Sequence, residues 1–281
     1  LVATTTESST LTVGGGLSGN FDLTGTAAEP VMAGAFSMVD GQFGAFRVPQ
    51  MESSLTYADH RLKGSLALRR LGEHLLDLDL DLPLDLALSA VVARRLDGPL
   101  SIRGVADSVD LAIAEVLTPQ VRRASGRFDA DVGISGTWTR PELAGAVTIT
   151  DGAMSLPSVG ARYERMSGRL VLVGDTIRVD TLSLESRPLV AKGDPGAATV
   201  GGYVRLEQLA RPVLSLHLAT REFHLMDVRS FLSATVTGDL DLTGPVVGAT
   251  LTGRGTMTRG VLYFADLVTK QVVNLQDTLF R

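Results

Sequence analysis

The sequence of 281 residues contains no cysteine, 4 histidines, 9 Phe, 4 Tyr and 1 Trp. The absence of cysteine excludes disulfides, thiolate catalysis and cysteine-ligated zinc or iron–sulfur sites. A net charge of -5 with 20% charged residues argues against a nucleic-acid binder, which needs a basic patch. Few aromatic side chains disfavour a surface that stacks sugars or bases. Apolar windows such as residues 31–39 are too short to span a bilayer, and no apolar run reaches 18 residues.

The chain is rich in glycine, with 30 residues, and 44% of its residues are hydrophobic. Abundant Leu, Val and Thr together with glycine indicate many strands joined by tight turns. The first 20 residues lack the basic and apolar regions of a signal peptide. We therefore expect the chain to be a piece of a longer polypeptide whose targeting segment or membrane anchor lies outside it.

A ladder of three glycines, spaced 9 and 7 residues apart, occurs three times, with periods of 111 and 108 residues. The turn residues of this repeat are Gly25, Gly34, Gly41, Gly136, Gly145, Gly152, Gly244, Gly253 and Gly260. Pro30 and Pro141 follow the first glycine by five residues, whereas the third copy has Pro245 directly after it. We expect a Gly-Thr-x-x-x-Pro turn between two strands, and a hairpin turn at Asp40-Gly41 and Asp151-Gly152.

This repeat indicates concatenated units rather than independent domains. Residues 1–18 are assigned to the end of a preceding unit, 19–125 to unit 1, 126–237 to unit 2 and 238–281 to the start of unit 3.

Strict alternation of apolar and polar residues predicts strands with one apolar face. Every even position of residues 76–88 is leucine, and Asp77, Asp79, Asp81 and Asp85 lie between them. Pro83 predicts an edge strand or a break there. Further strands are expected over residues 168–173, 176–185, 198–206 and 212–220. Helical crossing segments are expected over residues 108–117, capped by Asp107, over 228–232, capped by Asp227, and over 265–275.

No catalytic or metal-binding pattern stands out. The four histidines lack metal-site spacing, and a solvated role is favoured for His217 on its strand. The Asp77-x-Asp79-x-Asp81 run favours a solvated strand face over calcium, because Leu82 occupies the glycine position of a calcium loop. No nucleophile elbow or phosphate loop occurs, and Trp138 is interpreted as a packing residue in a turn. We therefore expect no enzyme, cofactor or metal, although a pair of carboxylates brought together in space stays open.

Residues 23–43, 134–186 and 260–280 resemble a known family. The shared style is a strand, a Gly-Thr-x-x-x-Pro-x-Leu-x-Gly turn, a strand ending in Asp-Gly, and a Gly-Asp-x-Ile strand start as at Gly174-Asp175-Thr176-Ile177. It is similar to the repeats of the TamB family, the inner-membrane subunit of the translocation and assembly module, and of the wider AsmA-like group. The resemblance runs from about residue 17 to the end of the chain.

The resemblance implies an all-β fold, an elongated antiparallel sheet curled into an open trough, or β-taco, with an apolar concave face. It implies the periplasmic portion of an inner-membrane-anchored protein of a diderm bacterium. Its implied partners are phospholipid acyl chains and an outer-membrane barrel protein, and its implied function is phospholipid transport between membranes with support of outer-membrane protein assembly.

We hypothesise that one apolar face lines a lipid-accommodating groove. The candidate lining residues are Leu76, Leu78, Leu80, Leu82, Leu84, Leu86, Leu88, Val147, Ile149, Leu170, Leu172, Ile177, Val179, Leu214, Leu216 and Leu218. The alternatives are a closed β-sandwich whose leucine faces pack on each other, and a repetitive surface or adhesin module. Such modules usually repeat at about 20–30 residues, which the long periods oppose.

Overall fold

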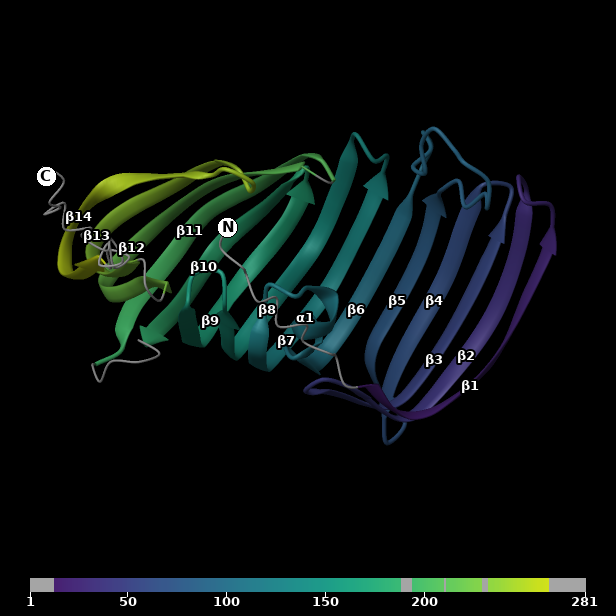
Figure 1. Ribbon diagram of the computed structural model, residues 1–281, viewed down its shortest axis with the longest axis horizontal. Helices are drawn as coiled ribbons and strands as arrows, with labels where there is room; N and C mark the ends of the chain where they lie inside the picture. Colours follow the sequence, from purple (N-terminus) through teal and green to yellow (C-terminus); the bar gives the residue numbers. More distant parts are fainter. Residues whose placement is uncertain (1–12, 188–193, 210, 229–231, 263–281) are drawn as a thin grey trace, which may run out of the picture.

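The computed structural model describes residues 13–187, 194–209, 211–228 and 232–262. Its strands form a single antiparallel sheet of fourteen, in which strands consecutive in sequence are neighbours in space (Figure 1). The strands are β1 Val13–Gly25, β2 Pro30–Phe43, β3 Phe46–Ala58, β4 Arg61–Arg70, β5 Glu73–Pro83, β6 Ser101–Asp110, β7 Arg122–Gly136, β8 Pro141–Leu156, β9 Ala161–Gly174, β10 Thr176–Arg187, β11 Gly196–Gln208, β12 Arg211–Val228, β13 Leu232–Pro245 and β14 Thr250–Leu262.

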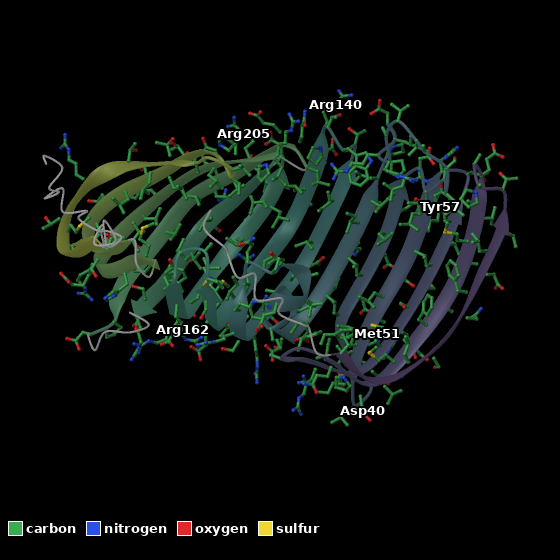
Figure 2. The ribbon with its side chains drawn as sticks, in the orientation of Figure 1. Asp40, Met51, Tyr57, Arg140, Arg162 and Arg205 are labelled. Carbon is green, nitrogen blue, oxygen red and sulfur yellow. The ribbon has the colours of Figure 1, made fainter. Side chains whose placement is uncertain are left out.

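The sheet is curled and does not close into a barrel, because β1 and β14 are paired on one side only. The predicted all-β, open and curled sheet is therefore confirmed, and the described strands do not divide into the two layers of a sandwich. The strands cross the long axis of the molecule, so their ends form two long rims (Figure 1). We call the rim that carries Arg140 the upper rim and the rim that carries Arg162 the lower rim (Figure 2).

The glycine repeat corresponds to a period of six strands. Its copies fall on β1–β2, β7–β8 and β13–β14. In the first two copies the turn has the same geometry: the N–H of Thr26 donates to the Glu29 carbonyl at 3.1 Å and that of Thr137 to the Arg140 carbonyl at 3.0 Å. Gly25 and Gly136 open these turns with φ of 85° and 86°. The boundaries assigned to the units fall inside β1, β7 and β13, and the sheet runs through them without a break.

The third copy builds a different turn, as the moved proline suggests. Pro245 is the last residue of β13, and the N–H of Val246 donates to the Pro212 carbonyl of β12 at 3.2 Å. The β13–β14 turn is thus tied to the neighbouring strand β12.

The middle glycine of each ladder faces an apolar residue of the preceding strand. Gly34 pairs with Phe21 and Gly145 with Val132, and Gly253 of the third copy pairs with Leu240. At Gly34 the ring of Phe21 lies where a side chain would be, whereas a Cβ at Gly145 would lie 1.9 Å from the Asp131 carbonyl oxygen. The middle glycine therefore lets neighbouring strands approach closely.

The prediction of hairpin turns at Asp40-Gly41 and Asp151-Gly152 is wrong. Both dipeptides lie inside strands, β2 and β8, which continue to Phe43 and Leu156. Asp40 and Asp151 have positive φ, 52° and 49°, and form β-bulges opposite Gly15 and Gly126. A bulge and a tight hairpin both need a residue with positive φ, so the same dipeptide suits either. Gly260 lies within β14 opposite Ala234.

The helix predicted over residues 108–117 forms only in its second half, because its first residues belong to β6. The one helix of the described residues, α1, spans only Ile113–Leu117. Asp107 lies in β6, and the helix has no side-chain cap, because Val109 pairs with Phe128 and extends the strand instead. Val228 and Leu232, the two ends of the second predicted helix, pair as antiparallel strand residues. Residues 229–231 and the stretch 265–275 lie outside the described residues.

Candidate functional site

The apolar face of the sheet is continuous across all fourteen strands. Cross-strand pairing links one row of residues from the first strand to the last, and each is apolar or glycine. The row is Leu17, Met38, Met51, Leu68, Leu76, Ala106, Ala130, Val147, Leu170, Val179, Gly202, Leu216, Leu242 and Leu251. We call this the apolar row.

The strand residues of the predicted lining set lie on this face. Leu76, Val147, Leu170, Val179 and Leu216 belong to the apolar row itself. The others occupy adjacent rows that the register connects to it: Leu78, Leu80, Leu82, Ile149, Leu172, Ile177, Leu214 and Leu218. Alternation in the sequence predicts which side chains of one strand share a face. The pairing register shows that the apolar faces of neighbouring strands lie on the same side of the sheet.

The predicted leucine strand over residues 76–88 is too long. β5 ends at Pro83, which is buried, and Leu84 makes only an isolated bridge to Arg95. Leu86 and Leu88 lie in the following loop, and Leu88 is 63% exposed. Proline has no N–H to continue the ladder, which explains the break. These three leucines are therefore not part of the sheet face.

The opposite face is polar. Asp77, Asp79 and Asp81 of β5 pair with Ala67, Ser65 and Lys63 of β4, and all point away from the leucines. Arg61 contacts Asp81 with its Nη2 at 2.7 Å from Oδ1, and His74 contacts Asp77 at 2.8 Å. These carboxylates thus face basic side chains on the outer surface. No group of three or more His, Asp or Glu residues in the described part of the chain is arranged to hold a metal ion.

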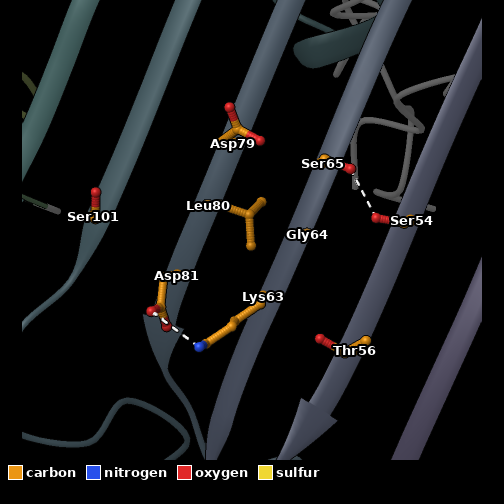
Figure 3. A pocket seen from close by; sticks show the side chains of 9 residues that line it. All are labelled: Ser54, Thr56, Lys63, Gly64, Ser65, Asp79, Leu80, Asp81 and Ser101. Carbon is orange, nitrogen blue, oxygen red and sulfur yellow. Dashed lines mark hydrogen bonds and ion pairs between the residues drawn. The ribbon is translucent and has the colours of Figure 1, made fainter.

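An open hollow of about 330 Å³ lies on this polar face (Figure 3). Its polar lining includes Thr56, Lys63, Asp79 and Ser101, and the hydroxyls of Ser54 and Ser65 contact each other at 2.7 Å above neighbouring strands. Small side chains on adjacent strands leave this space. At its edge the Nζ of Lys63 lies 3.9 Å from Oδ2 of Asp81.

The apolar face lies on the inside of the curl. Tyr163 of β9 and Phe223 of β12 both project from this face, and their rings stack with centroids 5.6 Å apart. Strands three positions apart in a flat sheet would be separated by about 14 Å. The Tyr163 hydroxyl also donates to the Leu225 carbonyl at 3.3 Å. These contacts form only because the sheet bends toward its apolar side.

Burial raises the pKa of Tyr163, so its phenol stays protonated and remains a donor. Beside it the hydroxyl of Ser186, which is 0% exposed, accepts from the N–H of His224 at 2.7 Å. The lower part of β12 is therefore fixed against β9 and β10 by side chains that the alternation pattern does not single out.

In unit 1 the lower end of the apolar face is covered by α1. Phe46, Val48, Leu68, Ala106, Val109 and Ala112 form a buried cluster there, with Ile113 of α1 packed against it. The Glu115 carboxylate accepts from the N–H of Ala124 at 2.7 Å and holds the helix against β7.

The upper end of unit 1 is covered by the loop over residues 84–100. The hydroxyl of Tyr57, which is 2% exposed, donates to the Leu84 carbonyl at 3.2 Å and accepts from the N–H of Leu86 at 2.9 Å. The loop also reaches the first turn, where the N–H of Leu88 donates to the Ala27 carbonyl at 2.8 Å. Trp138 lies at the other side of the loop, with its indole N–H donating to the Pro83 carbonyl at 3.3 Å.

Unit 2 has a smaller upper cover. Leu206 and Leu209, from the end of β11 and the turn after it, pack on a cluster that includes Leu143 and Leu172. The N–H of Leu209 donates to the Trp138 carbonyl at 3.1 Å. Trp138 therefore packs between the covers of both units, which agrees with its interpretation as a packing residue.

The chain matches no protein-family model, no curated protein and no solved structure. Within the described residues, no helix has the length and hydrophobicity needed to cross a membrane.

Proposed function

We propose that this chain carries phospholipid acyl chains along its apolar face, as part of a path for phospholipids between the inner and outer membranes of a diderm bacterium. The observation that supports this most directly is the apolar row, which runs through fourteen strands with no polar side chain in it. The sheet has no second layer of strands in the described residues to bury this face. Acyl chains would cover it, each buried methylene contributing about 0.8 kcal/mol.

The length of the face favours a path over a single binding site. Fourteen strands spaced by about 4.8 Å extend over about 60 Å, twice the roughly 30 Å hydrocarbon core of a bilayer. Several lipids could therefore lie one after another along the trough, while the polar outer face contacts water.

The rest of the proposal follows from the resemblance to the TamB family. It places the chain in the periplasm, anchored in the inner membrane by a segment outside it, and pairs it with an outer-membrane barrel protein whose assembly it supports. Edge strand β1 is compatible with a longer trough, because the apolar side chains of Leu17, Phe21 and Leu23 are at least half exposed there.

Photo-crosslinking from adjacent positions on opposite faces tests the proposal. A benzophenone amino acid at Leu80 should label radioactive phosphatidylethanolamine or phosphatidylglycerol from mixed vesicles, and the same group at Asp79 should not. Leu170 and Arg169 of β9 provide a second pair in unit 2. Equal labelling from both faces, or none from either, would reject the lipid path and favour a structural or adhesive module instead.

A further inference from the structure

The apolar face is buried near both ends of its strands and half-buried between them. In β3, Val48 near the lower rim and Tyr57 at the upper rim are each 2% exposed (Figure 2). In β9, Met166 and Leu172 are likewise buried. The residues of the same face that lie between these positions are half-buried, and we call them the central band. The central band includes Leu55, Leu66, Leu78, Val132, Val147 and Leu170.

Covers bound the central band along both rims in each unit. Along the lower rim the covers are α1 in unit 1 and the lower part of β12 in unit 2. Along the upper rim they are the loop over residues 84–100 in unit 1, and Leu206 and Leu209 in unit 2. The part of the apolar face that stays accessible is therefore a band that crosses the strands between two rows of covers.

The upper covers of the two units meet at Trp138, in the turn between β7 and β8. Its indole N–H donates to the Pro83 carbonyl, where the loop of unit 1 begins, and its own carbonyl accepts from the N–H of Leu209 at 3.1 Å. The guanidinium of Arg95, from the same loop, lies 5.5 Å from the centroid of the indole ring, within the range of a cation–π contact. One residue thus holds a cover on each side of the unit boundary.

Further backbone contacts attach these covers to the turns of the upper rim. At one end the N–H of Leu88 donates to the carbonyl of Ala27 in the β1–β2 turn. At the other end the N–H of Leu206 donates at 2.7 Å to the carbonyl of Asp175, between β9 and β10. The upper covers are therefore linked to one another and to the sheet from the β1–β2 turn to the β9–β10 turn.

We propose that the covers are the side walls of an acyl-chain track along the central band, and that Trp138 joins the upper walls of the two units. An acyl chain then passes from unit 1 to unit 2 without leaving over the upper rim. Trp138 is a positioning residue in this track, because it acts by holding the loop over residues 84–100 and Leu209 in place. This inference rests on the proposed acyl-chain path and adds its lateral limits.

The first test uses the unchanged chain. Trp138 is the single tryptophan of the sequence, so tryptophan fluorescence reports on the joint between the two covers alone. Bound dibromostearic acid should quench this fluorescence, because bromine quenches an indole ring only at short range, whereas bound stearic acid should not.

The second test measures how fast a bound fluorescent fatty acid is released to cyclodextrin in excess. Trp138→Ala should speed up release about tenfold, because changes at a binding surface act mainly on the dissociation rate. Trp138→Phe, which keeps an aromatic ring beside Arg95 and loses only the N–H, should have a smaller effect. The matched control is Tyr203→Ala on the outer face, which removes a similar contact with Arg205 at 5.6 Å and should leave the release rate unchanged.

The outcomes separate this inference from the proposed function. If the unchanged chain binds neither fatty acid, the acyl-chain path itself fails. If dibromostearic acid binds without quenching Trp138, the track does not pass this joint and the inference is wrong, although the path stands. A folded Trp138→Ala variant that releases the probe at the unchanged rate would also overturn it, because a purely structural role lowers stability without changing release. Should Trp138→Ala not fold, the quenching and Trp138→Phe decide the matter.

Discussion

The two six-strand units have the same strand order and glycine ladder but cover their apolar faces differently. In β1–β6 a 17-residue loop over residues 84–100 and the helix α1 fold over the two ends of the face. In β7–β12 the upper cover is a turn, and the lower one is β12 itself, which bends across to Tyr163 of β9. A repeated sheet thus keeps its strand pattern, while its connections and the covers that they form over the apolar face differ between the two units.

The largest difference in unfolding free energy between equivalent substitutions in the two units should appear at the middle glycine of the ladder. Gly145→Ala places a Cβ 1.9 Å from the Asp131 carbonyl oxygen at a φ of 113°, which should cost about 3–4 kcal/mol of unfolding free energy. At Gly34 the φ is not positive, and the nearest atoms belong to side-chain rings at 3.0 Å. Gly34→Ala should therefore stay within about 1 kcal/mol. Urea denaturation measures both, and equal losses would show that the two positions are not differently strained.

The next effect concerns the apolar row. Leu68 in unit 1 is buried beneath the cluster that α1 completes, whereas Leu170 in unit 2 is half-buried. Leu68→Ala should cost about 2–3 kcal/mol of stability, and Leu170→Ala about half of that. For binding of a fluorescent fatty acid the order should reverse, with the larger loss of affinity in Leu170→Ala. If Leu68→Ala weakened probe binding more, the open part of the face would lie in unit 1.

Each unit also contains a buried tyrosine that ties its cover to the sheet. The Tyr57 hydroxyl makes two hydrogen bonds to the loop, and that of Tyr163 makes one to β12. Tyr57→Phe should cost about 2 kcal/mol, because it leaves the N–H of Leu86 without this partner, and Tyr163→Phe about 1 kcal/mol. Hydrogen exchange of the Leu86 amide should speed up in Tyr57→Phe alone. Unchanged exchange there would show that the loop is held by other contacts.

Much of the sheet was readable from alternation, because the period of two residues is a local property of each strand. Leu76, Leu78, Leu80 and Leu82 share a face by that rule alone. The sequence does not predict that Leu76 and Val147 lie on the same face, because this depends on the pairing register through β6 and β7. Bulges complicate the register further, because each one shifts the alternation of a single strand.

The predictions that the structure contradicts failed for a similar reason, because contacts with other strands decide the local structure. Asp40-Gly41 offers positive φ, and only the facing Gly15, with its own φ of 116°, turns the dipeptide into a bulge instead of a hairpin. Residues 108–110 suit a helix start, yet the partner strand β7 takes Val109 and Asp110 into the sheet. The sequence does not predict that the loop over residues 84–100 and the lower part of β12 cover the apolar face. Tyr57 and Tyr163 hold them through backbone groups that are 27 and 62 residues away in the sequence.

The smallest expected effect is a difference between the polar outer faces of β5 and β13. In β5 the outer Asp81 faces Arg61, whereas the outer Asp241 of β13 faces His217 of β12 at 2.9 Å. The hydrogen bond that the His217 ring donates to Asp241, with Asp239 nearby, raises the pKa of His217 above its ordinary 6.5. Because the folded pKa is the higher one, the contact stabilises fully below about pH 6.5 and is lost as the pH rises through the folded pKa. An NMR titration of the His217 ring should show the raised pKa, Asp241→Asn should lower it, and Asp81→Asn should leave it unchanged. A His217 pKa at or below 6.5 in the unchanged chain would mean that the contact between His217 and Asp241 is open in solution.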